Sequence, residues 1–280
     1  MERIGFAGLG TMGLPMAGHL LAHGHAVAVW NRTPGKAGDL AAHEAPDLAA
    51  LAANCRIICL CVNRSEDVRA VVAGLMPHLA PGSLIVDHST IEPSVARDIA
   101  AQLQAAGHEF LDAPITGGSM GAQRGTLTIF CGGTEAAFQR AEPYLQAYGK
   151  TVEHVGASGQ GQMMKLANQI GVAGALMGLC ESLAFAQRAG LDIATTHRLL
   201  SGGAAGSWAF DNYGPKILAG DWSPGFSNKN QLKDLDYTLA AADGQPLPMT
   251  ELTANLLREM LAEGRGEEAT ASLYEKLRDA

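Results

Sequence analysis

The sequence predicts an α/β fold, in which a doubly wound parallel sheet is followed by an all-α domain joined to it by a long helix. Three observations support this prediction. A glycine-rich turn follows an apolar strand pattern at the N-terminus, strand and helix patterns alternate up to about residue 156, and helical patterns alone continue from there. The change of pattern predicts two domains, residues 1–158 and 159–280.

The first apolar segment, residues 3–7, predicts a buried strand that runs into the glycine-rich turn. Gly8, Gly10 and Gly13 have the G-x-G-x-x-G spacing, and a segment with helical spacing begins at Leu14. In a Rossmann-type domain the first glycine permits a sharp turn, the second lets a pyrophosphate approach the backbone, and the third lets the helix pack on the strand. We therefore expect a dinucleotide to bind at Gly8, Leu9, Gly10, Thr11, Met12 and Gly13.

The predicted second strand, residues 26–30, ends where a Rossmann-type domain contacts the adenosine ribose. An acidic residue there favours NAD, because its carboxylate binds the 2′-hydroxyl. This sequence instead has Asn31, Arg32 and Thr33, and the Arg32 guanidinium can pair with a 2′-phosphate. We therefore predict NADP(H) as the cofactor. NAD is the less favoured alternative, in which Arg32 is a solvated loop charge.

Further strands and helices alternate along the first half of the chain. The predicted strands are residues 56–62, 84–87, 109–113, 126–131 and 151–155. The predicted helices are residues 65–75, with Ser65 as N-cap, 93–106 and 134–147. The segments after these strands meet at one edge of a doubly wound sheet, where ligands bind. We therefore expect Ser89 or Thr90 to contact the cofactor.

A long helix is predicted over residues 159–189. Apolar and small residues occur all around it, which predicts burial on every side. Helical periodicity brings Gly161, Lys165, Asn168 and Gln169 to one side. A buried lysine has a lowered pKa and can exchange a proton near neutrality, and Gly161 would leave room for a flat ring or a substrate. The alternative is that Lys165 extends along the surface into solvent.

Two further segments carry candidate binding residues. The turn after residue 113 offers the Thr116 hydroxyl and the backbone N–H groups of Gly117 and Gly118 to a carboxylate or an oxyanion, although a bare turn has the same composition. Lys233 lies in a helix predicted over residues 228–242, where it either contacts the cofactor or is a solvated charge.

Composition excludes several classes of protein. The chain is 47% hydrophobic and 17% charged, which excludes a disordered chain, and its net charge of −8 argues against nucleic-acid binding. We expect no membrane span, no metal site and no signal peptide, and therefore a cytoplasmic protein. The five cysteines have no metal-binding spacing, so we expect reduced thiols that act as small apolar side chains.

Four segments together resemble the β-hydroxyacid dehydrogenase family, which includes 3-hydroxyisobutyrate dehydrogenase and tartronate semialdehyde reductase. In the family's order they are residues 8–17, 112–118, 161–168 and 233–235. The resemblance implies a Rossmann domain and a helical domain that forms the interface of a homodimer or homotetramer. It also implies that Lys165 is the general acid and base and that Val62, Asn63 and Lys233 contact the cofactor. The residues that it implies bind a small carboxylate substrate are Thr116, Gly117, Gly118, Asn168 and Gln169.

The resemblance implies NADP(H)-dependent interconversion of a small β-hydroxy acid and its semialdehyde. Thr116 stands where serine is commoner, Gln169 where many members have asparagine, and Val62-Asn63 where an apolar residue and proline are usual. The alternatives are an imine reductase-like enzyme, a glyoxylate or succinic semialdehyde reductase, and a dinucleotide-binding module without catalysis. Lys165 counts against an imine reductase, because the resemblance implies another residue type there in those enzymes.

Overall fold

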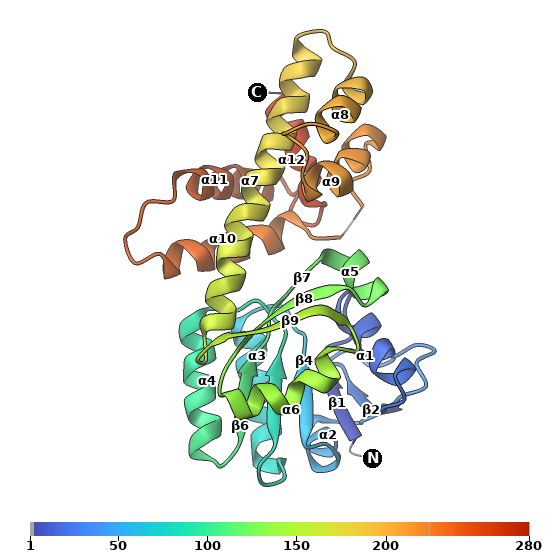
Figure 1. Cartoon of the computed structure of the whole chain (residues 1–280), viewed down its shortest axis with the longest axis vertical. Helices are drawn as coiled ribbons and strands as arrows, with labels where there is room; N and C mark the ends of the chain where they lie inside the picture. The colour runs from blue at the N-terminus through green and yellow to red at the C-terminus, as the bar shows by residue number, and fades with distance from the viewer. Residues whose placement is uncertain (1–2, 224, 280) are drawn as a thin grey trace. The chain divides into compact units, whose positions relative to one another are not determined.

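The computed structural model describes residues 3–223 and 225–279. The chain forms two compact units, Met1–Lys165 and Leu166–Ala280. Helix α7, Gln160–Arg188, begins in the first unit and continues into the second. Figure 1 shows the strands gathered in the N-terminal unit and helices alone in the C-terminal unit. The predicted fold class is confirmed.

The described part of the first unit contains a nine-stranded sheet. Its strands are β1 Arg3–Ala7, β2 Ala26–Trp30, β3 His43–Glu44, β4 Ile57–Leu60, β5 Leu84–Asp87, β6 Glu109–Asp112, β7 Ile115–Thr116, β8 Leu127–Gly132 and β9 Gly149–Gly156. The order is β3-β2-β1-β4-β5-β6-β8-β7, with β9 paired to β8. Strands β1 to β6 pair in parallel, whereas β8 runs antiparallel to β6 and β7.

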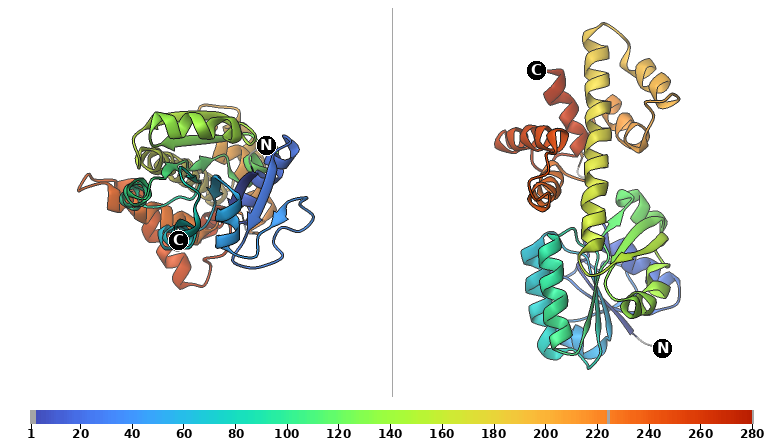
Figure 2. Two further views of the ribbon diagram at one scale, coloured as in Figure 1. Left: turned by 90° about the horizontal axis from the view of Figure 1, so that it is seen from below. Right: turned by 60° about the vertical axis from the view of Figure 1, so that its left-hand side comes forward.

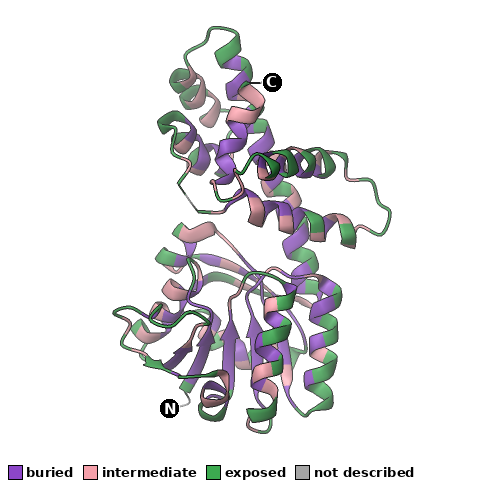
Figure 3. Cartoon of the chain, turned by 180° about the vertical axis from the view of Figure 1, so that it is seen from behind, coloured by how far each residue is buried: buried purple, intermediate pink, exposed green. Residues whose placement is uncertain are grey.

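Helices cover both faces of this sheet, as Figures 1 and 2 show. They are α1 Gly13–Ala22, α2 Leu48–Asn54, α3 Ser65–Leu75, η1 Met76–His78, α4 Pro93–Ala105, α5 Gly118–Arg124 and α6 Glu135–Leu145. Residues of α1, α5 and α6 pack in the core on one face, and residues of α2, α3 and α4 pack on the other. Strands β1, β2, β4, β5 and β6 are almost wholly buried, as their near-continuous apolar runs require (Figure 3).

The second unit is helical throughout its described part. Besides α7 it contains α8 Ile193–Ser201, α9 Trp208–Ala219, α10 Asn228–Ala241, α11 Pro248–Ala262, η2 Thr270–Ser272 and α12 Leu273–Arg278. Its core is formed where Leu176, Leu179 and Leu183 of α7 pack with apolar residues of α9, α10, α11 and α12. The predicted helix over residues 228–242 corresponds to α10.

Helix α7 is not buried on every side, so that prediction is wrong. The Phe185 side chain is 75% exposed, and Met164, Gly171 and Gly178 also lie on its exposed side. Apolar side chains on that side are exposed in the single chain, so an apolar composition alone does not require a face that is buried within the chain. By length and composition α7 could cross a membrane, but half of its most apolar window is buried within the chain, as in the core helix of a soluble protein.

A second local prediction is also wrong. Helix α3 begins at Ser65, but its N-cap is Arg64, and no side chain caps this end of the helix. The Ser65 hydroxyl instead accepts a hydrogen bond from the Glu92 backbone N–H at 3.2 Å. Ser65 therefore ties the start of α3 to the segment before α4, a tertiary contact that local sequence preferences do not reveal.

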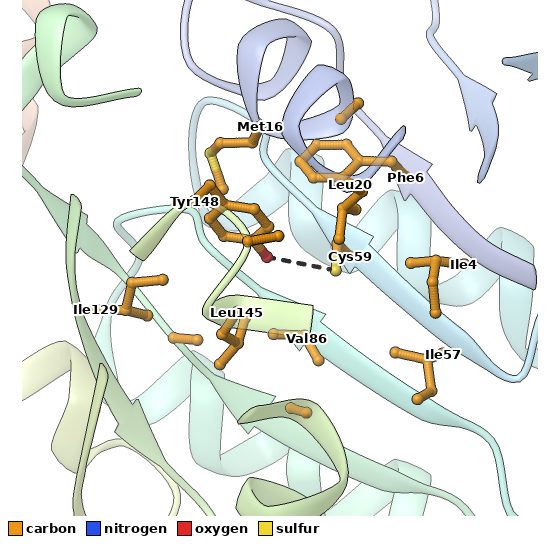
Figure 4. Packing of buried hydrophobic residues seen from close by; sticks show 14 of the residues in the cluster. Ile4, Phe6, Met16, Leu20, Ile57, Cys59, Val86, Ile129, Leu145 and Tyr148 are labelled. Carbon is orange, nitrogen blue, oxygen red and sulfur yellow. Dashed lines mark hydrogen bonds between the residues drawn. The ribbon is translucent and has the colours of Figure 1, made fainter. Parts of the chain in front are cut away.

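A buried polar chain crosses the core on the face of α1 and α6. Figure 4 shows Tyr148 among Met16, Leu20, Ile129 and Leu145, with its hydroxyl directed toward Cys59. The same hydroxyl lies 2.9 Å from Nε2 of His88, and Nδ1 of His88 lies 2.8 Å from the Ala113 carbonyl. Burial lowers the pKa of His88 to about 4, so the ring is neutral, donates from Nδ1 to Ala113 and accepts from Tyr148 at Nε2.

We expect Tyr148→Phe to lower the free energy of unfolding by about 1–3 kcal/mol, because it leaves Nε2 of buried His88 without a donor. Urea unfolding at pH 8 measures this loss.

The neutral His88 contributes its full stabilisation above the ordinary pKa of 6.5 and loses it as the pH falls toward 4, because the unfolded chain binds the proton first. If the variant and the wild type have equal free energies of unfolding, the hydrogen bond between Tyr148 and His88 contributes no net stabilisation.

Candidate functional site

The segments after β1, β2, β4, β5 and β6 carry most of the candidate residues of the first unit. These five strands pair in parallel, so the segments that follow them lie at the same edge of the sheet. Strands β1 and β4 are neighbours in the sheet. From β1 the chain order runs to one side, through β2 and β3, and from β4 it runs to the other side, through β5 and β6. Ligands of doubly wound folds bind where the chain order reverses in this way.

Each of the three glycines in the turn after β1 is explained differently. Gly8 has φ +100°, and a Cβ there would lie 2.2 Å from the Cys61 carbonyl oxygen. A Cβ on Gly13 would lie 1.9 Å from the Gly8 carbonyl oxygen, so α1 can pack on the turn only with glycine there. A Cβ on Gly10, by contrast, would meet no protein atom within 4 Å. Protein packing therefore explains Gly8 and Gly13 but not Gly10.

This turn fits a dinucleotide. Gly10 and Thr11 are exposed, and the first turn of α1 has no acidic residue and no side-chain cap. The partial positive charge at the helix N-terminus is therefore not neutralised by a carboxylate of that turn. The open space at Gly10 is what a pyrophosphate needs to approach the backbone closely.

Asn31 joins the glycine turn to the loop after β2. Its Oδ1 accepts a hydrogen bond from the Leu9 backbone N–H at 2.9 Å, and its Nδ2 donates to the Thr33 carbonyl at 2.8 Å. A cavity of about 290 Å³ lies beside this loop and is also lined by Glu44. Asn31 thus holds the predicted ribose-binding loop next to the turn that fits the pyrophosphate.

Arg32 extends from this loop into solvent, with 83% of its side chain exposed. Its guanidinium forms an ion pair of 3.0 Å with the Asp67 carboxylate at the start of α3. The guanidinium is therefore held at the end of β2, and a 2′-phosphate there would compete with Asp67 for it.

The segments after β4 and β5 are hydrogen-bonded to each other. The Val62 backbone N–H donates to the Ser89 hydroxyl at 2.9 Å, and the Ser89 N–H donates to the Asp87 carboxylate at 3.0 Å. Asn63 is exposed and Thr90 is half-buried. The structure thus places Val62, Asn63 and Thr90 at one edge of the sheet.

The turn after β6 requires its glycines. Thr116 is half-buried in β7, where it pairs with Thr128 of β8. Gly117 and Gly118 have φ of +128° and +65°, in the region that favours glycine. The short β7–β8 pairing fixes the Thr116 backbone, so the hydroxyl and the two following N–H groups are presented by a rigid element.

Asp112, the last residue of β6, is a buried carboxylate at the start of α7. Its Oδ1 accepts from the Gly159 backbone N–H at 2.7 Å, and its Oδ2 accepts from the Gln162 N–H at 2.9 Å. Burial raises the pKa of Asp112 to about 7, the two N–H donors lower it, and Asp87 raises it further. The carboxylate satisfies N–H groups that the beginning of a helix otherwise leaves unpaired.

Gly161 does not leave room for a substrate, contrary to the prediction. A Cβ there would lie 2.5 Å from the carbonyl oxygens of both Asp112 and Phe130. The glycine is needed because α7 begins in direct contact with the ends of β6 and β8. Lys165, one turn further along α7, is 7% exposed and therefore buried, rather than extended along the surface into solvent.

Three candidate side chains of the second unit form one chain of contacts with Asp234. The Asn168 amide donates to Gln169 Oε1 at 2.9 Å, and the Gln169 amide donates to Asp234 Oδ2 at 2.6 Å. Lys233 Nζ lies 3.1 Å from Asp234 Oδ1 and 5.3 Å from the centre of the Tyr237 ring. Lys233 is therefore held beside a buried carboxylate and is not a solvated charge.

Three buried polar residues of these networks, Asp112, Gln162 and Asp234, were not predicted from the sequence to have a role. Asp112 and Asp234 lie within the segments singled out, and Gln162 lies three residues before Lys165. A polar residue at the end of a buried strand, or beside a buried lysine, is a signal that could have identified the two aspartates. In residues 3–223 and 225–279, no group of three or more His, Cys, Asp and Glu side chains is arranged to hold a metal ion.

Both units match known protein families. Residues 3–156 match the NAD-binding domain of 6-phosphogluconate dehydrogenase, and residues 159–277 match the NAD-binding region of NADP-dependent 3-hydroxyisobutyrate dehydrogenase. Together the two matches account for nearly the whole chain.

Full-length relatives give the same result. The chain is 39% identical to the probable 3-hydroxyisobutyrate dehydrogenase-like 1, mitochondrial, of Arabidopsis thaliana, covering 97% of this chain and 84% of the relative. It is 34% identical to the 2-hydroxy-3-oxopropionate reductase of Escherichia coli, covering 98% and 97%. The solved structure of 3-hydroxyisobutyrate dehydrogenase from Salmonella typhimurium matches with a TM-score of 0.92 and 28% identity, covering 99% of this chain and 100% of that one.

Proposed function

This chain belongs to the β-hydroxyacid dehydrogenase family, and we propose that it is an NADP(H)-dependent enzyme that interconverts a small β-hydroxy carboxylic acid and its semialdehyde. Membership makes it a nicotinamide-dependent oxidoreductase that acts on CH–OH groups. The substrate class, the preference for NADP and the roles of individual residues are the proposal.

Lys165 is the proposed proton donor and acceptor. In the reductive direction its ammonium group protonates the oxygen that develops from the carbonyl, and in the oxidative direction its neutral amine removes the hydroxyl proton. The nicotinamide, when bound, supplies or accepts the hydride. The burial of Lys165 on the helix anchored to the end of β6 is the observation that carries this proposal.

The Thr116–Gly118 turn is the proposed carboxylate site. The Thr116 hydroxyl and the N–H groups of Gly117 and Gly118 are neutral donors, and they follow β6 at the edge of the sheet. Such donors hold a small carboxylate in a fixed orientation. In the second unit, we assign substrate contacts to Asn168 and Gln169 and a cofactor contact to Lys233, each oriented by the chain of contacts that includes Asp234.

We assign the 2′-phosphate of NADP to Arg32, with Asn31 and Thr33 shaping the loop. Arg32→Asp should raise the Michaelis constant for NADPH on the order of 10–100-fold, because a charge-assisted hydrogen bond to the phosphate is lost. The Michaelis constant for NADH should change little. The matched variant Asp67→Asn releases Arg32 from its ion pair and should lower only the NADPH value. Equal effects on both cofactors would contradict this assignment.

We also propose a homodimer or homotetramer that associates through the helical unit, and a cytoplasmic location. Several large apolar side chains of this unit are exposed, and the two most exposed are Phe185 at 75% and Leu199 at 61%. Contact with a second subunit would remove this surface from water. All five cysteines are free, which suits a reducing compartment.

The experiment that tests the proposed function is a reduction assay over a panel of short carboxylate semialdehydes, with NADPH and NADH measured separately. We include tartronate, methylmalonate and succinate semialdehydes, together with glyoxylate and a cyclic imine. Turnover should be highest with a carboxylate semialdehyde and NADPH. Cofactor binding without reduction of any carbonyl would support a non-catalytic module, and turnover of the imine alone would contradict hydroxyacid chemistry.

A further inference from the structure

Gln162 joins the beginning of α7 to the segment that follows β5. Its side chain is fully buried, its Nε2 donates to the Ser89 carbonyl at 2.8 Å, and its Oε1 accepts from the Ile91 backbone N–H at 3.1 Å. Both ends of the amide are therefore used, and only glutamine or asparagine offers a donor and an acceptor in this form. The segment that contains Thr90 is held between the two bonds.

The same connection reaches the segment after β4. The Ser89 hydroxyl accepts from the Val62 backbone N–H at 2.9 Å, so Gln162, Ser89 and Val62 form one buried chain of hydrogen bonds. The Asp112 carboxylate makes the second attachment of α7, through the N–H groups of Gly159 and Gln162. The beginning of α7 is thus fixed to the end of β6 and to the segments after β4 and β5 at the same time.

Lys165 follows Gln162 by three residues, so the two side chains lie on neighbouring positions of one helix face. A helix is stiff over one turn, and any shift of its first turn moves Lys165 with it. We infer that Gln162 and Asp112 are positioning residues that hold Lys165 in place relative to the end of β6 and the segments after β4 and β5. The inference rests on the proposed function, because the position of Lys165 matters to the reaction only if Lys165 transfers the proton.

The test compares two glutamines on the same turn of α7. Gln162→Met preserves the size of the side chain and removes both hydrogen bonds, and Gln160→Met is the matched control because Gln160 is exposed. We expect Gln162→Met to lower kcat on the order of 10–100-fold, because a small misplacement of a catalytic group has an effect of this size. Because the same bonds hold the segment with Thr90, the dissociation constant for NADPH can rise, but by a smaller factor than kcat falls. Gln160→Met should keep the wild-type kcat.

Asp112→Asn tests the second attachment. It preserves the shape of the side chain but directs an amide donor at one of the two backbone N–H groups. We expect a loss of kcat of about tenfold or more with little change in NADPH binding. Gln162→Glu keeps the acceptor for Ile91 but, when ionised, turns an acceptor oxygen toward the Ser89 carbonyl in place of the donor. It serves as the second variant if Gln162→Met does not fold.

The decisive readout is the coupling to Lys165. If Gln162 acts through Lys165, the double variant Gln162→Met with Lys165→Ala should have the same kcat as Lys165→Ala alone. Two results would overturn the inference if Lys165→Ala is impaired as expected. In the first, the factors by which the two single variants lower kcat multiply in the double variant. In the second, Gln162→Met has the wild-type kcat. Wild-type kcat in Lys165→Ala would instead remove Lys165 from the proposed function, so the two failures are distinguishable.

Discussion

Lys165→Ala should lower kcat for semialdehyde reduction on the order of 10²–10⁴-fold, the usual contribution of a general acid or base. The substitution removes a buried ammonium group, and the alanine side chain has no proton to donate. The Michaelis constants for the cofactor and the semialdehyde should change far less than kcat, because the proton is transferred only as the reaction proceeds. Steady-state assays with the preferred semialdehyde at saturating NADPH measure the effect.

Two controls accompany this variant. Lys150→Ala removes an exposed lysine of the same unit and should leave kcat unchanged. Lys165→Arg keeps the positive charge but holds its protons too tightly to exchange them near neutrality, so it should also be strongly impaired. A kcat of Lys165→Ala close to that of the wild type would contradict the proposed role.

Gly10→Ala should weaken NADPH binding without lowering stability, whereas Gly13→Ala should lower the free energy of unfolding. A methyl group at Gly10 meets no protein atom within 4 Å, so the melting temperature should stay close to the wild-type value. The same methyl group would occupy the space that the pyrophosphate needs, and the dissociation constant for NADPH should rise about 10–100-fold through weakened charge-assisted hydrogen bonds. Fluorescence titration with NADPH measures the binding.

Gly13→Ala should lower the free energy of unfolding by about 1–3 kcal/mol, because its Cβ would lie 1.9 Å from the Gly8 carbonyl oxygen and α1 must shift. Urea unfolding without cofactor measures this loss. The contrast between the two variants separates a ligand effect from a packing effect within one motif. Equal NADPH binding in Gly10→Ala and the wild type would contradict a pyrophosphate site at this turn.

Much of the fold could be predicted because local patterns and tertiary structure agree in the first unit. The apolar run that contains β4 is buried on both faces of a parallel sheet, and the helix beginning at Ser65 has the bounds that its periodicity predicts. The strands β3 and β7 were not predicted, because each has two residues and no periodicity to detect. The antiparallel direction of β8 likewise depends on pairing with distant residues.

The candidate site was predictable where a motif carries its own physical reason. Gly8, Gly13 and the Gly117-Gly118 turn have backbone or packing requirements that only glycine meets, and the space beside Gly10 is open, as a pyrophosphate site requires. The contacts of Gln162 with Ser89 and Ile91 link residues more than seventy positions apart, and such pairs leave no local signature. The Gly161 prediction was wrong for the same reason, because the atoms that require glycine belong to Asp112 and Phe130.

A crystal structure with NADP⁺ and a small β-hydroxy acid tests the central claim most directly. We predict that Lys165 Nζ lies within about 2.7–3.2 Å of the substrate hydroxyl oxygen, with the substrate carboxylate on the Thr116–Gly118 turn. A substrate whose hydroxyl is out of hydrogen-bonding reach of Lys165, directly or through one water molecule, would contradict it.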